Sequence, residues 1–224
     1  MTTSSEKIPG KGVFIVDDHP IVRQGLCSLL EAQPDLYVCG ESDNAGEALR
    51  AVETSRPDVM IVDVSLKGTD GLELTKSVRA IDNEIPILIV SMHDEALYAE
   101  RALRAGANGY VMKQQVSDKV VEAIRQVLRG DIYVSDDIRR RILLGMRGKQ
   151  TSEEKTPMER LSDRELEVFR LLGNGHTTRR IAEELHLSIK TVETYRAHIK
   201  EKLSLDNATE LLRYAVQWVE QEQG

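Results

Sequence analysis

Five polar residues stand at the ends of short apolar runs, where they could do chemistry together: Asp17, Asp18, Asp63, Ser91 and Lys113. A short apolar run bounded by turn residues indicates a strand that is buried on both faces. Open parallel sheets place their chemistry just outside the carboxyl ends of the strands. We therefore expect these five side chains to meet at one edge of a sheet.

The chemical types in this set favour a metal ion and a phosphoryl group. Three carboxylates crowded together repel one another unless a cation is near, and an oxygen-rich set suits Mg²⁺, which takes few protein ligands and keeps several waters. The Lys113 ammonium and the Ser91 hydroxyl can both contact phosphoryl oxygens. Asp63 could then attack a phosphorus centre with metal help. An isolated Asp after a strand more often simply begins a loop, so the hypothesis depends on the whole set.

The composition is that of a globular protein with an acidic balance. The chain has 224 residues, of which 41% are hydrophobic and 30% charged, and a net charge of −7. This length allows one large domain or two small ones, and any nucleic-acid contact requires a local basic patch. No apolar run approaches the roughly 18 residues of a membrane span, and the N-terminus shows no secretion signal. Cys27 and Cys39 lack metal-ligand spacing, so we expect reduced core thiols in a cytoplasmic protein.

The first half of the chain alternates short apolar runs with amphipathic stretches. The apolar runs predict strands at 12–17, 37–40, 59–63, 86–91 and 109–113. The amphipathic stretches predict helices that begin near Pro20, Asn44, Gly71, Ala96 and Val116. Five such pairs imply a parallel sheet with helices on both faces and right-handed crossovers.

These strand-end residues resemble the receiver domain of two-component response regulators. The segments Gly68-Thr-Asp-Gly71 and Ala105-Gly-Ala-Asn-Gly-Tyr110 are also similar to that family. The resemblance covers about residues 11–130, which we assign to a receiver domain. It implies an α/β fold of the flavodoxin-like type, with a five-stranded parallel sheet in the order 2-1-3-4-5.

The resemblance also implies a role for each site residue. Asp63 is the expected phosphoacceptor, and Ser91 and Lys113 are expected to contact the phosphoryl group. Tyr110 is the expected aromatic switch that follows the movement of Ser91. The Mg²⁺ ligands that the resemblance implies are Asp17, Asp18, Asp63 and the backbone carbonyl of Ser65.

One position departs from the receiver pattern. Receivers usually have proline four residues after the phosphoacceptor, and this chain has Lys67. Without the fixed φ of proline the loop is less rigid. Because no ligand is lost, we expect the chemistry to survive, with a changed loop geometry and phosphoryl lifetime.

Residues 131–157 are expected to form a linker with one short helix. Apolar residues between 136 and 146 fall among three arginines at helical spacing, and residues 145–157 are almost entirely polar. We interpret Arg139-Arg-Arg141 as a solvated helix face and not as a nucleic-acid patch.

Residues 158–222 predict a compact unit of four helices. Ser162 and Glu165 have the spacing of a capping box at its start, and the turn His186-Leu-Ser188 joins two helices in the manner of a helix-turn-helix. The helix after Ser188 is locally basic within an acidic chain, so it could bind phosphates and base edges. The candidate DNA contacts on it are Lys190, Thr191, Thr194, Arg196, His198, Lys200 and Lys202.

This unit resembles the LuxR-type output domain of the NarL/FixJ class of response regulators. The similar segments are Leu161–Val168, Ile181–Leu185, Ser188–Tyr195 and Ile199–Leu203. The resemblance implies a recognition helix that enters the major groove. Two departures limit it, because Glu193 and Ala208 stand where members often have lysine and arginine, so neither of those contacts is carried over.

The two halves together predict a DNA-binding transcriptional response regulator and not an enzyme. We expect a sensor histidine kinase or a small acyl phosphate to phosphorylate Asp63, and self-dephosphorylation is compatible with this role. Phosphorylation is expected to favour a homodimer on double-stranded DNA, without any membrane contact.

Three alternatives stay open at this point. An aspartyl-phosphate hydrolase usually has a second Asp two residues after its nucleophile, where this chain has Ser65. A protein-interaction module would signal without DNA, but the basic helix after Ser188 argues against this alternative. A DNA-binding protein that does not need phosphorylation would have no use for the intact acidic set.

Overall fold

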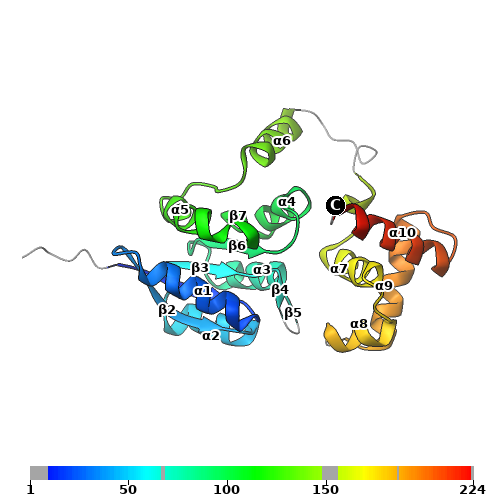
Figure 1. The fold of residues 1–224 in the computed structure, drawn as a ribbon, viewed down its shortest axis with the longest axis horizontal. Coiled ribbons are helices and arrows are strands. Elements are labelled where there is room, and N and C mark those ends of the chain that lie inside the picture. The colour runs from blue at the N-terminus through cyan, green and yellow to red at the C-terminus, as the bar shows by residue number, and fades with distance from the viewer. Residues whose placement is uncertain (1–9, 67–68, 148–155, 186, 223–224) are drawn as a thin grey trace, which may run out of the picture.

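The computed structural model describes residues 10–66, 69–147, 156–185 and 187–222. A sheet with its surrounding helices forms the first half, and a bundle of helices forms the second half (Figure 1). The predictions about Lys67 and His186 concern positions outside the described residues.

The sheet has the predicted flavodoxin-like order. Its five strands are all parallel to their neighbours and lie in the order β2-β1-β3-β6-β7. The strands are β1 Lys11–Val16, β2 Leu36–Ser42, β3 Val59–Val62, β6 Ile87–Ser91 and β7 Gly109–Met112. Two short strands, β4 Ser65–Leu66 and β5 Thr69–Asp70, form a separate antiparallel pair that the sequence analysis did not anticipate.

Helices cover both faces of the sheet because the strand residues alternate in direction. Along β1, Val13 and Ile15 belong to one buried cluster, and Phe14 and Val16 belong to another. The first cluster is closed by α1 Pro20–Glu31 and α5 Val116–Leu128, and the second by α2 Ala45–Thr54, α3 Gly71–Ile81 and α4 Glu95–Ala105. Full burial of each such aliphatic side chain contributes roughly 1.5–3 kcal/mol.

The predicted linker begins as a part of the first half. Tyr133 pairs with the outer strand, since its carbonyl accepts from Tyr110 N at 2.8 Å and its N–H donates to Asn108 O at 2.9 Å. The linker helix, α6 Asp136–Arg147, then packs against α4. The short helix expected in the linker is therefore present, and the segment before it belongs to the first half. The Arg139 guanidinium lies 2.8 Å from Asp136, as expected for a solvated helix face.

The second half consists of a short 3-10 turn, η2 Pro157–Arg160, and four helices. They are α7 Asp163–Gly173, α8 Thr178–Glu184, α9 Ile189–Lys202 and α10 Ala208–Glu222. The predicted capping box is confirmed, because Ser162 N donates to Glu165 Oε2 at 2.7 Å and Glu165 N donates to Ser162 Oγ at 3.3 Å. Phe169 anchors the bundle core against the rings of Tyr214 and Trp218.

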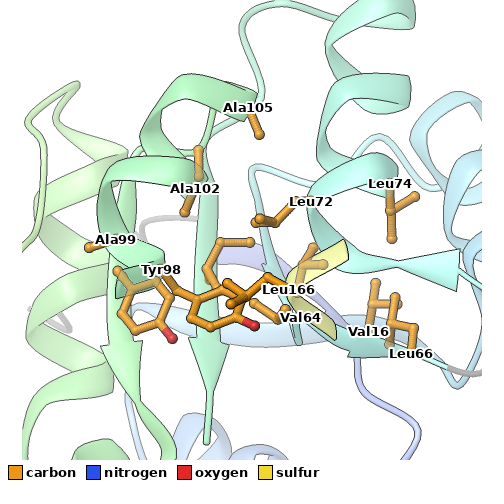
Figure 2. Close-up of a cluster of buried hydrophobic side chains, with 14 of the residues drawn as sticks. Val16, Val64, Leu66, Leu72, Leu74, Tyr98, Ala99, Ala102, Ala105 and Leu166 are labelled. Atoms are coloured by element: carbon orange, nitrogen blue, oxygen red, sulfur yellow. The ribbon is translucent and has the colours of Figure 1, made fainter. Parts of the chain in front are cut away.

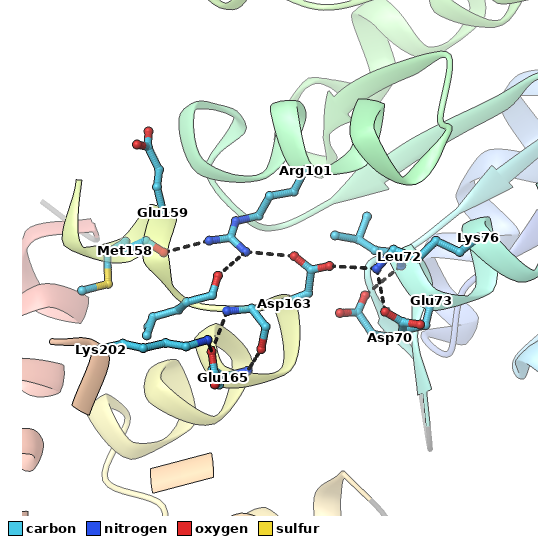
Figure 3. A network of polar contacts seen from close by, with 12 residues as sticks. Asp70, Leu72, Glu73, Lys76, Arg101, Met158, Glu159, Asp163, Glu165 and Lys202 are labelled. Atoms are coloured by element: carbon cyan, nitrogen blue, oxygen red, sulfur yellow. Dashed lines mark hydrogen bonds and ion pairs between the residues drawn. The ribbon is translucent and has the colours of Figure 1, made fainter. Parts of the chain in front are cut away.

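The two halves are in direct contact through the start of α7. Leu166 packs into the apolar cluster that contains Tyr98 and Leu72 of the first half (Figure 2). The Arg101 guanidinium donates to the carbonyls of Met158 and Leu161, at 2.8 and 2.9 Å, and to Asp163 at 2.9 Å (Figure 3). We call these contacts, together with the one between Lys76 and Asp163 at 3.3 Å, the interdomain contact.

Candidate phosphorylation site and recognition helix

Asp63 lies directly after the central strand β3. Its N–H donates to Val16 O at 2.8 Å, so the ladder between β1 and β3 fixes its backbone, and its side chain is only 3% exposed. The chain then returns so closely that a Cβ on Gly71 would lie 1.9 Å from Asp63 O. Only glycine permits this approach, which places the first turn of α3 behind the carboxylate.

Lys113 joins the carboxylates of two strands. Its Nζ lies 2.6 Å from Asp17 Oδ2 and 2.7 Å from Asp63 Oδ2. Burial raises the pKa of Asp63. The charge of Lys113 lowers this pKa and the charge of Asp17 raises it, so that the pKa of Asp63 is about 6. Burial also disfavours the charged form of Lys113, but the Asp63 and Asp17 carboxylates outweigh it and raise the pKa of Lys113. The three groups therefore form one coupled, largely buried unit.

The acidic side chains converge closely enough to hold one cation. Asp17, Asp18, His19 and Asp63 each present a ligand atom within 4.8 Å of the others. Asp18 Oδ1 is buried without a hydrogen-bond partner among the described residues, and His19 Nδ1 lies 2.7 Å from it. A hard oxygen donor set with one unsatisfied oxygen fits a divalent cation such as Mg²⁺. His19 belongs to this set although the sequence pattern did not indicate it.

Ser91 and Tyr110 are brought together at the same edge. Ser91 ends β6 and is fully buried, and its Oγ accepts from His93 N at 3.2 Å. The Tyr110 hydroxyl donates to His93 O at 2.9 Å. Burial raises the pKa of Tyr110, and a hydrogen bond with Ser91 partly offsets this rise. The ring of Tyr110 thus points inward beside Ser91.

His93 is a site residue that sequence reasoning missed. Its Nε2 lies 3.0 Å from Ser65 Oγ, and its ring stacks on Tyr98 with 4.4 Å between centroids. Burial lowers the pKa of His93, and the charges of Arg170 and Lys113 lower it further, to about 3. The ring is therefore neutral at physiological pH. It lies in the loop after β6, where no periodic pattern could have indicated it.

A cleft of about 650 Å³ lies between the two halves at this site. From the first half it is lined by Asp63, Met92, His93 and Lys113, among others. The second half contributes residues of α7 and α8, together with Leu185, which follows α8. The second half of the chain therefore forms one wall of the cleft that contains Asp63.

The recognition helix α9 presents most of its predicted contacts to solvent. Lys190, Thr194, His198 and Lys202 are exposed, and Thr191, Arg196 and Lys200 are partly exposed. Ser188 caps the helix by accepting from Thr191 N at 3.0 Å. Lys202 lies 2.6 Å from Glu165 and Arg196 lies 3.1 Å from Glu193, so these two cations have partners within the bundle.

Comparisons with known proteins identify both halves. Residues 13–125 match the response regulator receiver domain, and residues 159–215 match the luxR family of bacterial regulatory proteins. The chain is a response regulator of the NarL/FixJ family. It is 35% identical to response regulator GacA of Pseudomonas aeruginosa, over 91% of this chain and 94% of that protein. It is also 35% identical to oxygen regulatory protein NreC of Staphylococcus carnosus, over 91% of this chain and 96% of that protein.

Solved structures of this response regulator family have the same architecture. The structure of RcsB from Salmonella enterica serovar Typhimurium, bound to a promoter with a phosphomimetic, matches with a TM-score of 0.64 and 27% identity. That match covers 92% of this chain and 98% of the RcsB chain. Among the described residues of the regulator, no helix is long and apolar enough to span a membrane.

Proposed function

We propose that this response regulator accepts a phosphoryl group on Asp63 and thereby controls its binding to double-stranded DNA. The observation that carries the proposal is the Asp63 carboxylate held 2.7 Å from Lys113 at the carboxyl edge of the sheet. An Asp63 oxygen forms the new bond to phosphorus, and the bond from phosphorus to the leaving group breaks. With a phosphohistidine donor the leaving group is the imidazole of a sensor kinase, and with acetyl phosphate it is acetate.

The acidic set supports a Mg²⁺ requirement. We infer that Asp17, Asp18, Asp63 and the Ser65 carbonyl hold the ion. When bound, Mg²⁺ neutralises charge that develops on the transferring phosphoryl group. Lys113 keeps its charge at physiological pH because its pKa is raised, so it can contact a phosphoryl oxygen. Ser91 offers a hydroxyl from the neighbouring strand.

The interdomain contact gives the phosphoryl group a route to the DNA-binding half. Ser91 ends β6 and His93 lies in the loop that follows it. The His93 ring stacks on Tyr98, which packs near Leu166 of α7. Movement of Ser91 and Tyr110 toward a phosphoryl group shifts this loop and loosens the contact. The released halves can then form a homodimer. Self-dephosphorylation and a cytoplasmic location are consistent with this scheme.

The exposed face of α9 supports DNA as the partner. Positive side chains on a helix within an acidic chain provide phosphate contacts, and the residues after Ser188 can reach base edges. RcsB, which shares the architecture, was solved bound to DNA. A symmetric dimer would place two such helices in successive major grooves, on half-sites one helical turn apart.

The direct test is the intact mass of the protein after incubation with acetyl phosphate and Mg²⁺. We expect a gain of one phosphoryl group in the wild type and no gain in Asp63→Asn. A gain in the variant would place the modification elsewhere, and no gain in the wild type would remove the phosphoacceptor role.

A further inference from the structure

One wall of the cleft that contains Asp63 belongs to the DNA-binding half. Glu167, Arg170 and Leu171 of α7 line it, opposite Asp63 and Lys113. Residues 167, 170 and 171 share one face of α7, because side chains three and four positions apart are neighbours on a helix. The helix that makes the interdomain contact at its start therefore carries this face over the phosphoacceptor.

Most of the charged groups in the cleft already have partners of opposite charge. Glu167 lies 2.7 Å from Arg164, and Glu183 lies 3.2 Å from Arg179. Lys113 is held between two carboxylates. These groups are therefore engaged before any ligand enters the cleft.

Arg170 has an electrostatic partner in Glu167, but its hydrogen bonding is incomplete. Its Nε is buried and has no hydrogen-bond partner among the described residues. A buried donor without an acceptor is destabilising, so the position calls for an acceptor that the protein alone does not supply. Arg170 also lies near the phosphorylation loop, since its charge and that of Lys113 both act on His93. Two cations thus approach the same loop from opposite halves of the molecule.

A phosphoryl group is the ligand that suits this arrangement. It brings three strong acceptor oxygens into the cleft, and a guanidinium presents planar donors that match phosphate geometry. We propose that Arg170 binds the phosphoryl group of the incoming donor, so that the DNA-binding half contributes to the Asp63 site before the transfer, while the two halves are still in contact. This inference rests on the proposed function of Asp63 and adds a residue from α7 to its phosphoryl site.

One consequence concerns the phosphoryl donor. Because Arg170 lines the same cleft as Asp63, it can contact a small dianionic donor there and strengthen donor binding. The experiment measures the initial rate of phosphorylation of the full-length chain as a function of acetyl phosphate concentration, at fixed Mg²⁺. The wild type is compared with Arg170→Gln, Arg170→Lys and a matched control, Arg213→Gln, which removes an exposed arginine on α10.

We expect Arg170→Gln to raise the half-saturating acetyl phosphate concentration about tenfold, with the maximal rate nearly unchanged. Arg170→Lys should recover part of the loss, because a lysine keeps the charge but not the fork geometry. Arg213→Gln should behave as the wild type. Equal half-saturating concentrations for the wild type and Arg170→Gln would overturn the inference, as would a loss confined to the maximal rate. No phosphorylation of the wild type would instead remove the proposed function itself.

Discussion

The Arg101 guanidinium of α4 donates to the Asp163 carboxylate of α7 at 2.9 Å, and only 10% of the Arg101 side chain is exposed. The same guanidinium satisfies two backbone carbonyls just before α7. One residue of the receiver thus holds the segment that leads into α7. The same helix carries the residues that line the cleft from the DNA-binding half. Such partly buried, charge-assisted hydrogen bonds contribute about 1.5–3 kcal/mol each in favourable cases.

Removal of Arg101 should therefore open the molecule without phosphorylation. We expect Arg101→Ala to weaken the interdomain contact by about 1–3 kcal/mol and to raise the DNA affinity of the unphosphorylated protein about tenfold. The measurement is fluorescence anisotropy on a labelled duplex. Arg104→Ala is the matched control, since Arg104 is exposed and its ion-pair partner is Glu100 on the same helix. Equal affinities for the wild type and Arg101→Ala would show that the contact does not restrain binding.

Asp70 should make the stability of the closed molecule depend on pH. Burial, reinforced by Glu167 of the other half, raises the pKa of Asp70 to about 7. In the unfolded chain Asp ionises near its usual value of about 4. The folded state therefore holds a proton that the unfolded chain has lost. Stability from this group is fully present below about pH 4 and is lost as pH rises to about 7, by on the order of 1 kcal/mol per pH unit.

The test for Asp70 compares urea unfolding of the wild type and Asp70→Asn between about pH 5 and pH 8. The amide oxygen of Asn can still accept from Leu72 N, so the cap of α3 is kept. The free energy of unfolding of the wild type should fall relative to that of the variant as the pH rises to about 7. Above about pH 7 the two curves of stability against pH should run parallel. Parallel curves over the whole range would show that Asp70 ionises normally.

Gly71 should be irreplaceable for steric reasons. An added Cβ would collide with Asp63 O at 1.9 Å, and backbone atoms cannot move aside cheaply. We expect Gly71→Ala to lower the free energy of unfolding by about 1–3 kcal/mol and to slow phosphorylation of Asp63. Gly25→Ala is the control, because nothing lies within 4 Å of its added Cβ and it is helical. That change should raise stability by about 0.5–1 kcal/mol.

Asp18 should matter chiefly for the cation. Its buried Oδ1 has no hydrogen-bond partner among the described residues, and Asp18 belongs to the acidic set that could hold the ion. We expect Asp18→Asn to weaken Mg²⁺ binding about tenfold in isothermal titration calorimetry, and Glu53→Gln, an exposed change on α2, to leave it unaltered. Unchanged Mg²⁺ affinity in Asp18→Asn would place the ion elsewhere.

The fold of each half could be predicted from sequence because its signals are local. The apolar run 59–62 indicated β3, and the spacing of Ser162 and Glu165 indicated the start of α7. A helix was expected to begin near Asn44, and Asn44 caps α2. Strand-end position also brought Asp17, Asp63 and Lys113 together. These features depend on neighbours in the chain or on the common edge of a parallel sheet.

The features that sequence reasoning missed depend on contacts between distant segments. His93 lies in a loop, and Arg170 lies on a helix whose periodicity says only that it is amphipathic. Their meeting in the cleft follows from the docking of the two halves, which no local pattern encodes. Tyr133 was likewise assigned to the linker, because a single residue that pairs with β7 has no strand periodicity.

The central claim is that a phosphoryl group on Asp63 controls DNA binding. The most direct measurement is the affinity of the full-length protein for a duplex selected from a random pool, with and without acetyl phosphate and Mg²⁺. The account predicts that affinity rises about tenfold or more on phosphorylation, stays low in Asp63→Asn, and falls steeply with added salt. Affinity that is the same in all three states would contradict the account, even if Asp63 proved to carry the phosphoryl group.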